Sequence, residues 1–346
     1  MQQRQLGRSG LRVSAVSLGT MTFGGRGPFA NVGQTDVDEA RAILDRCMDA
    51  GVNLIDTADI YSDGASEEMV GQIVEGRRHE FLLATKCRFP NEPGPNGAGG
   101  SRHHMVRSLE ASLRRLGTDY VDLYQLHGWD GQTPLEETLS TLDSFVRSGK
   151  VRYIGCSNYS AWHLVKALAV AHEHRLERFA SHQIYWSLIG RDAEVELVPA
   201  ALDQGLGILV WSPLAGGLLT GRYRRDAKPA SGSRQLTDWG EPPVHDEAKV
   251  YDIVDVLVDV AAAHGVPPAQ VALAWLLHRP GVSSVIVGAR DSAQVSQTLP
   301  AGDLALGAEE IDRLDKVSSS PLPYPLWHQA KTVSDRLSPA DRVLLG

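Results

Sequence analysis

The amino-acid sequence predicts a (β/α)8 TIM barrel formed by one domain, residues 1–346. Three observations predict this fold: eight short runs rich in Val, Ile and Leu, helical patterns between the runs, and a length of 346 residues. The runs lack strict apolar–polar alternation, which is typical of parallel strands buried on both faces. Strands that alternate with helices favour right-handed βαβ units, and eight such units can close into a barrel.

The expected elements follow one another along the chain with few interruptions. Apolar periodicity and glycine stops place helices at 36–50, 66–74, 101–116, 135–148, 161–173, 194–204, 247–264 and 268–278. The strands are expected at 14–18, 53–55, 81–85, 121–126, 151–155, 182–185, 207–210 and 284–287.

Three segments lie outside this repeat. Residues 4–13 predict a small hairpin around 8–10 that caps the floor of the barrel. Pro- and Gly-rich loops are expected at 90–100 and 228–244. The C-terminal residues 321–346 carry Tyr324, Trp327 and His328 and are more aromatic than a solvated tail, so we expect a C-terminal substrate loop.

Composition and charge exclude several classes of partner. The net charge of −8 argues against nucleic acid and anionic membranes, because binding to either needs a basic face. No apolar run approaches the roughly 20 residues of a membrane span, and the N-terminus lacks the apolar core of a signal peptide. The three cysteines, Cys47, Cys87 and Cys156, are isolated and odd in number. These features predict a cytoplasmic protein with reduced thiols.

Four polar residues stand where chemistry is expected in such a barrel. Asp56, Lys86 and His127 each directly follow an expected strand, and Tyr61 lies five residues beyond Asp56. The carboxyl ends of the strands meet at one rim, where barrel enzymes build their active sites. A phenol, an ammonium, a carboxylate and an imidazole at one rim provide a tuned proton donor, which carbonyl reduction requires.

Each of the four has a chemical role in this hypothesis. Tyr61 is the general acid, and its phenol has an ordinary pKa of about 10. Lys86 is expected to lower that pKa, Asp56 to hold Lys86 protonated, and His127 to orient the carbonyl. Taken singly, a Tyr such as Tyr61 is more often a packing residue and a His such as His127 is usually structural, while Lys86 is as easily explained by a rim ion pair with Asp56.

The chain resembles an aldo-keto reductase over nearly its whole length. The resemblance rests on the ordered motifs LGTMTFG, DTADIYSDGASEEMVG, YQLHG, RYIGCSNY, WSPLAGGLLTGRY and VIVGARDSAQ. It is closer to the bacterial branch related to potassium-channel β subunits than to the aldose-reductase branch. The resemblance implies NADPH-dependent reduction of an aldehyde or ketone, and the catalytic tetrad of the family matches Asp56, Tyr61, Lys86 and His127.

A nicotinamide cofactor would occupy a site without the usual dinucleotide motif, because no GxGxxG follows a strand. The resemblance implies that Ser157, Asn158 and Gln183 hydrogen-bond the carboxamide and that Trp211 stacks on the nicotinamide, where many relatives have Tyr. It also implies backbone contacts from the loop after strand seven to the pyrophosphate. The remaining residues of the expected NADPH/NADP+ site are Thr20, Met21, Asp56, Ser212, Pro213, Leu214, Gly216, Arg222 and Arg234.

Arg290 distinguishes NADPH from NADH in this interpretation. A 2′-phosphate needs a fixed cation, and the guanidinium group offers a planar fork for it. The phosphate-and-adenine stretch of the family matches at Gly288, Arg290 and Gln294, but Thr298 stands where an Asn is usual, which weakens the expected adenine contacts. Arg290 could instead cap a helix that begins near Asp291.

The substrate is not identified by the sequence. The expected pocket walls are Met21, Phe23, Phe89, Trp129, Trp186, Tyr324 and Trp327, although Phe23 and Phe89 could equally pack within loops. Aldehydes, keto sugars, pyridoxal-like rings and polyketide ketones all remain open as small-molecule carbonyl substrates, and so does a homo-oligomer.

Two other functions compete with the reductase. A cofactor-binding regulatory or accessory subunit is the main alternative, and the intact tetrad argues against it. Another barrel enzyme, such as an isomerase or hydrolase, would need paired carboxylates or metal ligands at the rim. No metal is expected, because the histidine pairs at 103–104 and 172–174 lack ligand spacing.

Overall fold

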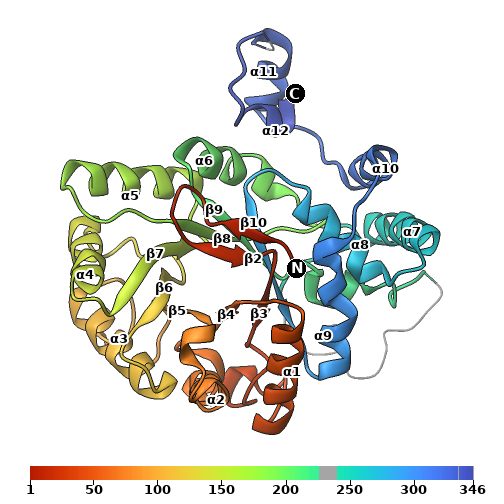
Figure 1. The fold of residues 1–346 in the computed structure, drawn as a ribbon. Coiled ribbons are helices and arrows are strands. Elements are labelled where there is room, and N and C mark those ends of the chain that lie inside the picture. Colours follow the sequence, from red (N-terminus) through yellow and green to blue (C-terminus); the bar gives the residue numbers. More distant parts are fainter. Residues whose placement is uncertain (226–239, 334, 346) are drawn as a thin grey trace.

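The computed structural model describes residues 1–225, 240–333 and 335–345. Eight parallel strands close into a barrel in the order β10-β3-β4-β5-β6-β7-β8-β9, which confirms the predicted fold (Figure 1). Most strands extend one or two residues beyond the expected runs. Their bounds are β3 Val16–Gly19, β4 Leu54–Asp56, β5 Leu82–Cys87, β6 Val121–Leu126, β7 Val151–Ser157, β8 Ser181–Tyr185, β9 Gly207–Trp211 and β10 Val282–Gly288.

Helices surround the barrel on all sides (Figure 1). Several begin at the side chains that the sequence offers as caps: the oxygens of Asp36, Ser101 and Ser160 each accept a hydrogen bond from a backbone N–H in the first helical turn. The bounds are α1 Val37–Asp49, α2 Ala65–Val74, α3 Arg102–Leu116, α4 Leu135–Arg147, α5 Ala161–Glu173, α6 Leu197–Gln204, α7 Glu247–His264, α8 Pro268–Leu277, α9 Ser292–Thr298, α10 Ala308–Ser318, α11 Leu326–Thr332 and α12 Arg342–Leu345.

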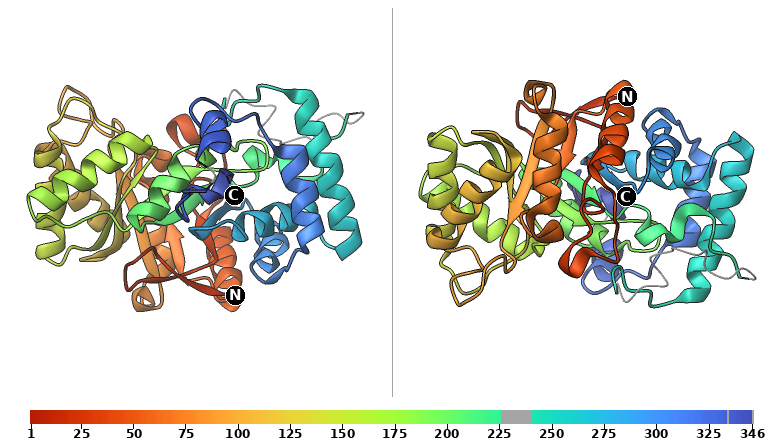
Figure 2. Two further views of the ribbon diagram at one scale, coloured as in Figure 1. Left: turned by 90° about the horizontal axis from the view of Figure 1, so that it is seen from above. Right: turned by 90° about the horizontal axis from the view of Figure 1, so that it is seen from below.

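The N-terminal hairpin closes one end of the barrel, as predicted. Strands β1 Gln3–Gln5 and β2 Arg12–Ser14 pair antiparallel. Leu6 and Val13 are fully buried in an apolar cluster with residues that point into the barrel, namely Leu54, Ala84, Leu123, Leu209 and Ile286. Figure 2 shows the N-terminal segment at one end of the barrel. The opposite end, where the strands finish, is therefore the end at which a ligand can enter.

Gly7 allows the hairpin to pack closely against the start of β9. Its φ of +58° is left-handed, and a Cβ atom there would lie 2.4 Å from the backbone nitrogen of Gly207. We expect Gly7→Ala to lower the free energy of unfolding by about 1–3 kcal/mol through backbone strain and displaced packing, measured by urea denaturation. Gly10→Ala is the matched control, because a Cβ there meets only the Tyr153 hydroxyl oxygen, at 3.9 Å. Equal stability of both variants and wild type would contradict this explanation.

The C-terminal segment leaves the barrel after α10 and carries α11 and α12 (Figure 1). Tyr324 is 75% exposed and Trp327 is 47% exposed. Their rings contact each other, with centroids 6.0 Å apart. Neither residue lines the cavity described below, so the expected C-terminal substrate loop is not found there.

No single helix of the described residues is both long enough and apolar enough to cross a membrane. Helices α7 and α8 meet the length and composition limits only together, and the chain bends by 97° between them. Both helices contribute buried residues to the main apolar core, for example Leu257 and Leu273.

Candidate active site

The four candidate catalytic residues meet at the open end of the barrel. Asp56 is the last residue of β4, and His127 follows the last residue of β6, as expected. Lys86 lies inside β5 rather than after it, and Tyr61 begins a short 3-10 turn. Asp56, Tyr61 and His127 line one cavity, and Lys86 is fully buried beside them.

Lys86 and Asp56 form a buried ion pair. The Nζ atom of Lys86 donates to Oδ1 of Asp56 at 2.5 Å and to the carbonyl oxygen of Thr57 at 2.8 Å. Burial acts to lower the pKa of Lys86, but the charge of Asp56 and the nearby Tyr61 more than offset it, so the pKa is raised. Lys86 is therefore a fixed cation at neutral pH.

Two amides complete the surroundings of Asp56. Nε2 of Gln183 donates to Oδ2 of Asp56 at 2.8 Å, and Nε2 of Gln125 donates to the same oxygen at 3.3 Å. Both carboxylate oxygens thus accept hydrogen bonds from buried donors. These hydrogen bonds and the ion pair with Lys86 offset the desolvation free energy of the buried Asp56 carboxylate.

Tyr61 lies directly over this pair. The Nζ atom of Lys86 is 5.1 Å from the centre of the Tyr61 ring. Burial raises the pKa of Tyr61; Lys86 lowers it and Asp56 raises it again, and the net direction is upward. Lys86 acts in the expected direction, but burial outweighs it, so the pKa of Tyr61 is not brought below its ordinary value. At neutral pH, Tyr61 is a neutral phenol that carries a proton to donate.

The turn after Tyr61 is held in an unusual backbone conformation. Ser62 and Asp63 have φ values of +52° and +53°, in the left-handed region that non-glycine residues seldom occupy. The buried hydroxyl of Ser62 donates to the carbonyl oxygen of Phe23 at 2.7 Å. Such conformations persist only where the surroundings fix them, so the position of Tyr61 is tightly determined.

His127 faces Tyr61 across the same end of the barrel. The ring centroids of the two residues are 5.7 Å apart, and the ring of Phe89 packs on His127 at 4.8 Å. Burial, and then the charges of Lys86 and Arg88, hold the pKa of His127 well below its usual value. The imidazole is neutral at physiological pH. Its Nδ1 is buried without a hydrogen-bond partner among the described residues, and the residue itself lines the cavity.

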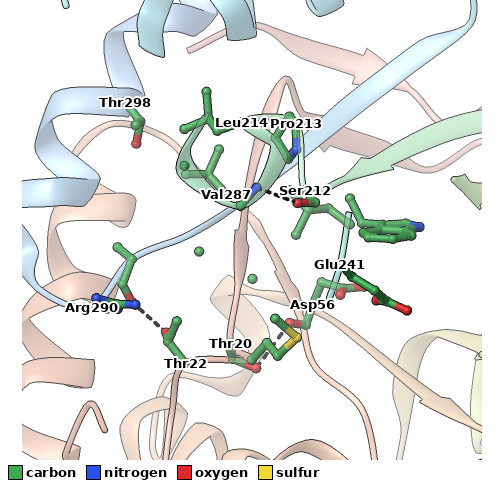
Figure 3. Close-up of a pocket in the computed structure, with 18 of the residues that line it drawn as sticks. Thr20, Thr22, Asp56, Ser212, Pro213, Leu214, Glu241, Val287, Arg290 and Thr298 are labelled. Carbon is green, nitrogen blue, oxygen red and sulfur yellow. Dashed lines mark hydrogen bonds between the residues drawn. The ribbon is translucent and has the colours of Figure 1, made fainter. Parts of the chain in front are cut away.

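One cavity of about 870 Å³ contains these groups and extends well beyond them. Figure 3 shows Ser212, Pro213 and Leu214 grouped on one side, Arg290 and Thr298 on another, and Asp56 apart from both. Of the expected cofactor residues, Arg234 falls outside the described residues. All the others line this cavity: Thr20, Met21, Asp56, Ser157, Asn158, Gln183, Trp211, Ser212, Pro213, Leu214, Gly216, Arg222, Gly288, Arg290, Gln294 and Thr298.

Comparison with known proteins agrees with this geometry. Residues 15–319 match the aldo/keto reductase family. The chain belongs to this family. It is 39% identical over 341 residues to an uncharacterized oxidoreductase, YrpG, of Bacillus subtilis, an alignment that covers 93% of this chain and 97% of the relative.

Two other relatives are named for different functions. A probable voltage-gated potassium channel subunit beta of Oryza sativa is 38% identical over 330 residues, with 92% of this chain and 97% of the relative covered. An L-glyceraldehyde 3-phosphate reductase of Escherichia coli K12 is 34% identical over 332 residues, with 91% and 92% covered. The family thus includes both enzymes and proteins named as channel subunits.

In this aldo/keto reductase, the expected carboxamide-binding residues are already joined to one another. The Ser157 hydroxyl donates to the carbonyl oxygen of Gln183 at 3.0 Å. The Asn158 side chain bridges two neighbours: its Nδ2 donates to the carbonyl oxygen of His127 at 3.1 Å, and its Oδ1 accepts from Nε1 of Trp211 at 3.0 Å. Asn158 thus ties the Trp211 ring to the backbone of His127.

The loop after β9 is a tight turn in which several residues are left-handed and the N–H groups of Ala215 and Gly217 bond to backbone carbonyls within the loop. Ser212, Ala215, Gly216 and Gly217 all have positive φ values, and Gly217, at +100°, adopts a conformation that favours glycine. The N–H of Gly216 donates to the Ser212 hydroxyl oxygen at 3.2 Å. An anion that binds to Gly216 would have to replace this internal bond.

Helix α9 provides the other end of the cavity. The Asp291 side chain caps this helix by accepting from the N–H of Gln294 at 2.7 Å, so the cap does not need Arg290. Gln294 in turn holds Arg290 through its Oε1, which accepts from the backbone N–H of Arg290 at 3.3 Å. Thr298 donates its hydroxyl to the carbonyl oxygen of Val295 at 3.0 Å, which leaves only acceptor capacity for a ligand.

The expected pocket walls are partly wrong. Met21 and Phe89 line the cavity, but Phe23 and Trp186 are fully buried in the core. Phe23 turns inward in a tight turn in which its N–H donates to the carbonyl oxygen of Thr20. Trp129 is also wrongly placed by the sequence, since it stacks on His163 with ring centroids 3.8 Å apart, outside the cavity.

Several cavity residues escaped the sequence analysis. Phe29 and Ile60 are apolar residues beside Tyr61, and the ring centroids of Phe29 and Tyr61 are 5.4 Å apart. The available signal was that Ile60 lies within the DTADIY motif and that Phe29 follows LGTMTFG by five residues. Glu241 carried no signal, because it lies in an irregular segment far from any motif. The other missed residues include Thr22, Pro267 and Gln297.

Proposed function

We propose that this aldo/keto reductase catalyses the NADPH-dependent reduction of an aldehyde or ketone to an alcohol. One observation carries the proposal: the buried Lys86–Asp56 pair lies beneath the neutral phenol of Tyr61, with the neutral imidazole of His127 beside it. We also propose that residues 1–346 act as a single domain.

Each residue then has a defined task. A bound nicotinamide would supply hydride to the carbonyl carbon. Tyr61 donates its phenolic proton to the carbonyl oxygen, and the nearby ammonium of Lys86 stabilises the phenolate that remains. His127 donates a hydrogen bond from Nε2 and orients the carbonyl. Because burial raises the pKa of Tyr61, the proton is present for reduction at neutral pH.

The described residues fit a dinucleotide. The cavity has the volume of a ligand site, and its polar groups are spread along it. Gln183 has its Nε2 engaged with Asp56, so its Oε1 can accept from a carboxamide. Trp211 offers a ring for stacking, the left-handed turn at 212–217 suits a pyrophosphate, and Arg222 and Arg290 add positive charge at the cavity wall.

Arg290 leads to a prediction about cofactor choice. A guanidinium group binds a phosphate through paired charge-assisted hydrogen bonds. We expect Arg290→Ala to weaken NADPH binding roughly tenfold to a hundredfold and NADH binding by no more than about twofold, measured by fluorescence titration. Gln297→Ala, a change at the same cavity without loss of charge, is the control. Equal losses for both cofactors would show that Arg290 does not recognise the 2′-phosphate.

An accessory subunit is the second candidate, supported by the 38% identity to a probable channel β subunit. The deciding experiment measures NADPH oxidation with a reactive aromatic aldehyde and runs NADH alongside. Turnover supports the reductase. Quenching of tryptophan fluorescence by NADPH without turnover on a panel of aldehydes, ketones and keto sugars would favour the accessory subunit.

A further inference from the structure

A layer of inward-facing residues lies in the barrel next to Lys86. In the sheet register, Lys86 pairs with Gln125, Gln125 with Gly155, and Gly155 with Ser181. Gln125 is fully buried and does not line the cavity. It can therefore influence a reaction only through the residues it contacts.

Gly155 provides the space that Gln125 occupies. A Cβ atom on Gly155 would lie 3.3 Å from Cγ of Gln125 and 2.4 Å from Oγ of Ser181. The φ of Gly155 is not among the positive values, so the need for glycine here is spatial. With no side chain on Gly155, Gln125 has room in the interior and its Nε2 reaches Oδ2 of Asp56.

Stability explains only one end of the Gln125 side chain, the Nε2 that donates to the buried carboxylate of Asp56. Its Oε1 is buried and accepts no hydrogen bond from the described part of the chain. A buried polar group without a partner costs free energy, and an apolar side chain of similar size would avoid that cost. Its one hydrogen bond goes to Asp56, the partner of Lys86.

The side-chain amides of Gln183 and Gln125 both donate to Asp56, but they differ in whether they also line the cavity. Gln183 lines the cavity and is exposed to changes when a cofactor binds, whereas Gln125 is screened from it. Removal of Gln183 would disturb the cofactor site and Asp56 together. Gln125 acts on Asp56 alone, and through Asp56 on Lys86 and Tyr61.

We infer that Gln125 is a positioning residue of the proton donor. Its amide dipole partly neutralises Asp56 and holds the carboxylate toward Lys86, which keeps the ammonium aimed at Tyr61. This inference rests on the proposed reductase function. It adds a residue that acts without touching substrate or cofactor.

Two variants separate this role from packing. Gln125→Leu removes the donor at similar volume, and we expect kcat to fall about tenfold while the KM for NADPH stays within about twofold. Gln125→Glu places a second carboxyl beside Asp56, and one of two close carboxyls keeps its proton to higher pH. When protonated, that carboxyl can donate to Asp56. We therefore expect kcat of Gln125→Glu to be near wild type at low pH and to fall as pH rises.

A second readout does not depend on turnover. The ultraviolet absorbance of tyrosinate is followed against pH in the apoprotein, and the contribution of Tyr61 is isolated by subtracting a matched Tyr61→Phe background. In Gln125→Leu, the charge of Asp56 is no longer partly neutralised by the amide, so it acts more strongly on Tyr61. The Tyr61 phenol should therefore titrate at higher pH. The added charge in Gln125→Glu should move this titration further.

Ser181→Ala is the control, because Ser181 lies in the same buried layer and its hydroxyl has no hydrogen-bond partner among the described residues. It should leave kcat, its pH profile and the Tyr61 titration unchanged. If folded Gln125→Leu and Gln125→Glu match wild type in the Tyr61 titration, the inference is wrong, whether or not wild type turns over. If wild type reduces no carbonyl but the titration shifts as expected, the proposed function fails and the positioning of Tyr61 by Gln125 is upheld.

Discussion

Tyr61→Phe should lower kcat by at least about a hundredfold, the usual contribution of a general acid, and leave NADPH affinity within about twofold. The reason is local: the substitution removes the phenolic proton of Tyr61 beside the Lys86–Asp56 pair, while Lys86, Asp56 and the cavity residue Trp211 stay in place. Steady-state turnover with an aromatic aldehyde and fluorescence titration with NADPH measure the two quantities.

Tyr124→Phe is the matched control for this experiment. Tyr124 is a fully buried tyrosine in β6 that packs on Phe145, outside the cavity, so the same loss of a hydroxyl should leave turnover nearly unchanged. Near-normal turnover of Tyr61→Phe would remove Tyr61 from its role. Loss of NADPH binding in that variant would instead indicate a disturbed cavity.

Lys86→Met should abolish most turnover and also destabilise the fold. The substitution leaves the carboxylate of Asp56 inside the barrel with only two amides as partners, and removing one member of a buried ion pair typically costs about 3–5 kcal/mol. Urea denaturation measures the free energy of unfolding. A loss below about 1 kcal/mol would mean that Asp56 readily becomes neutral or hydrated in the variant.

The double variant Asp56→Asn with Lys86→Met tests the explanation. It removes both charges, so it should regain much of the lost stability without regaining turnover. The pH dependence follows from the raised pKa of Lys86. The stabilisation is complete below the unfolded-state pKa of about 10.4 and is lost as pH rises through the higher folded-state value. The stability difference between wild type and Lys86→Met should therefore persist through neutral pH and shrink as Lys86 loses its proton in alkaline solution.

The fold could be predicted because local signals agreed along the whole chain. Capping side chains such as Asp36 and Ser101 mark where helices begin, and glycines such as Gly117 and Gly205 mark where they end. Strand ends were also visible at Asp56 and His127, and the barrel topology gathers strand ends at one rim. The place of the tetrad thus followed from the order of the strands.

The sequence did not predict the direction in which each side chain points, nor the net effect of burial and opposing charges on the pKa of Tyr61. Phe23 and Met21 are neighbours in one motif, yet the turn after β3 sends Phe23 into the core and Met21 into the cavity. Nε1 of Trp186 donates to Oε1 of Glu194 away from the cavity. The sequence does not reveal this contact. The pKa of Tyr61 is set by burial against opposing charges, and its direction depends on how far each group lies from the phenol.

The closed barrel also has a consequence for how the chain acquires its structure. Strand β3, near the start of the sequence, pairs with β10, near its end, and Leu6 of the hairpin packs against Ile286 in the same apolar cluster. During synthesis, β3 therefore leaves the ribosome long before its partner β10 is made. Such non-local pairing slows folding and leaves apolar surface open in the meantime. Nascent chains truncated before β10 should accordingly bind chaperones that recognise exposed apolar segments.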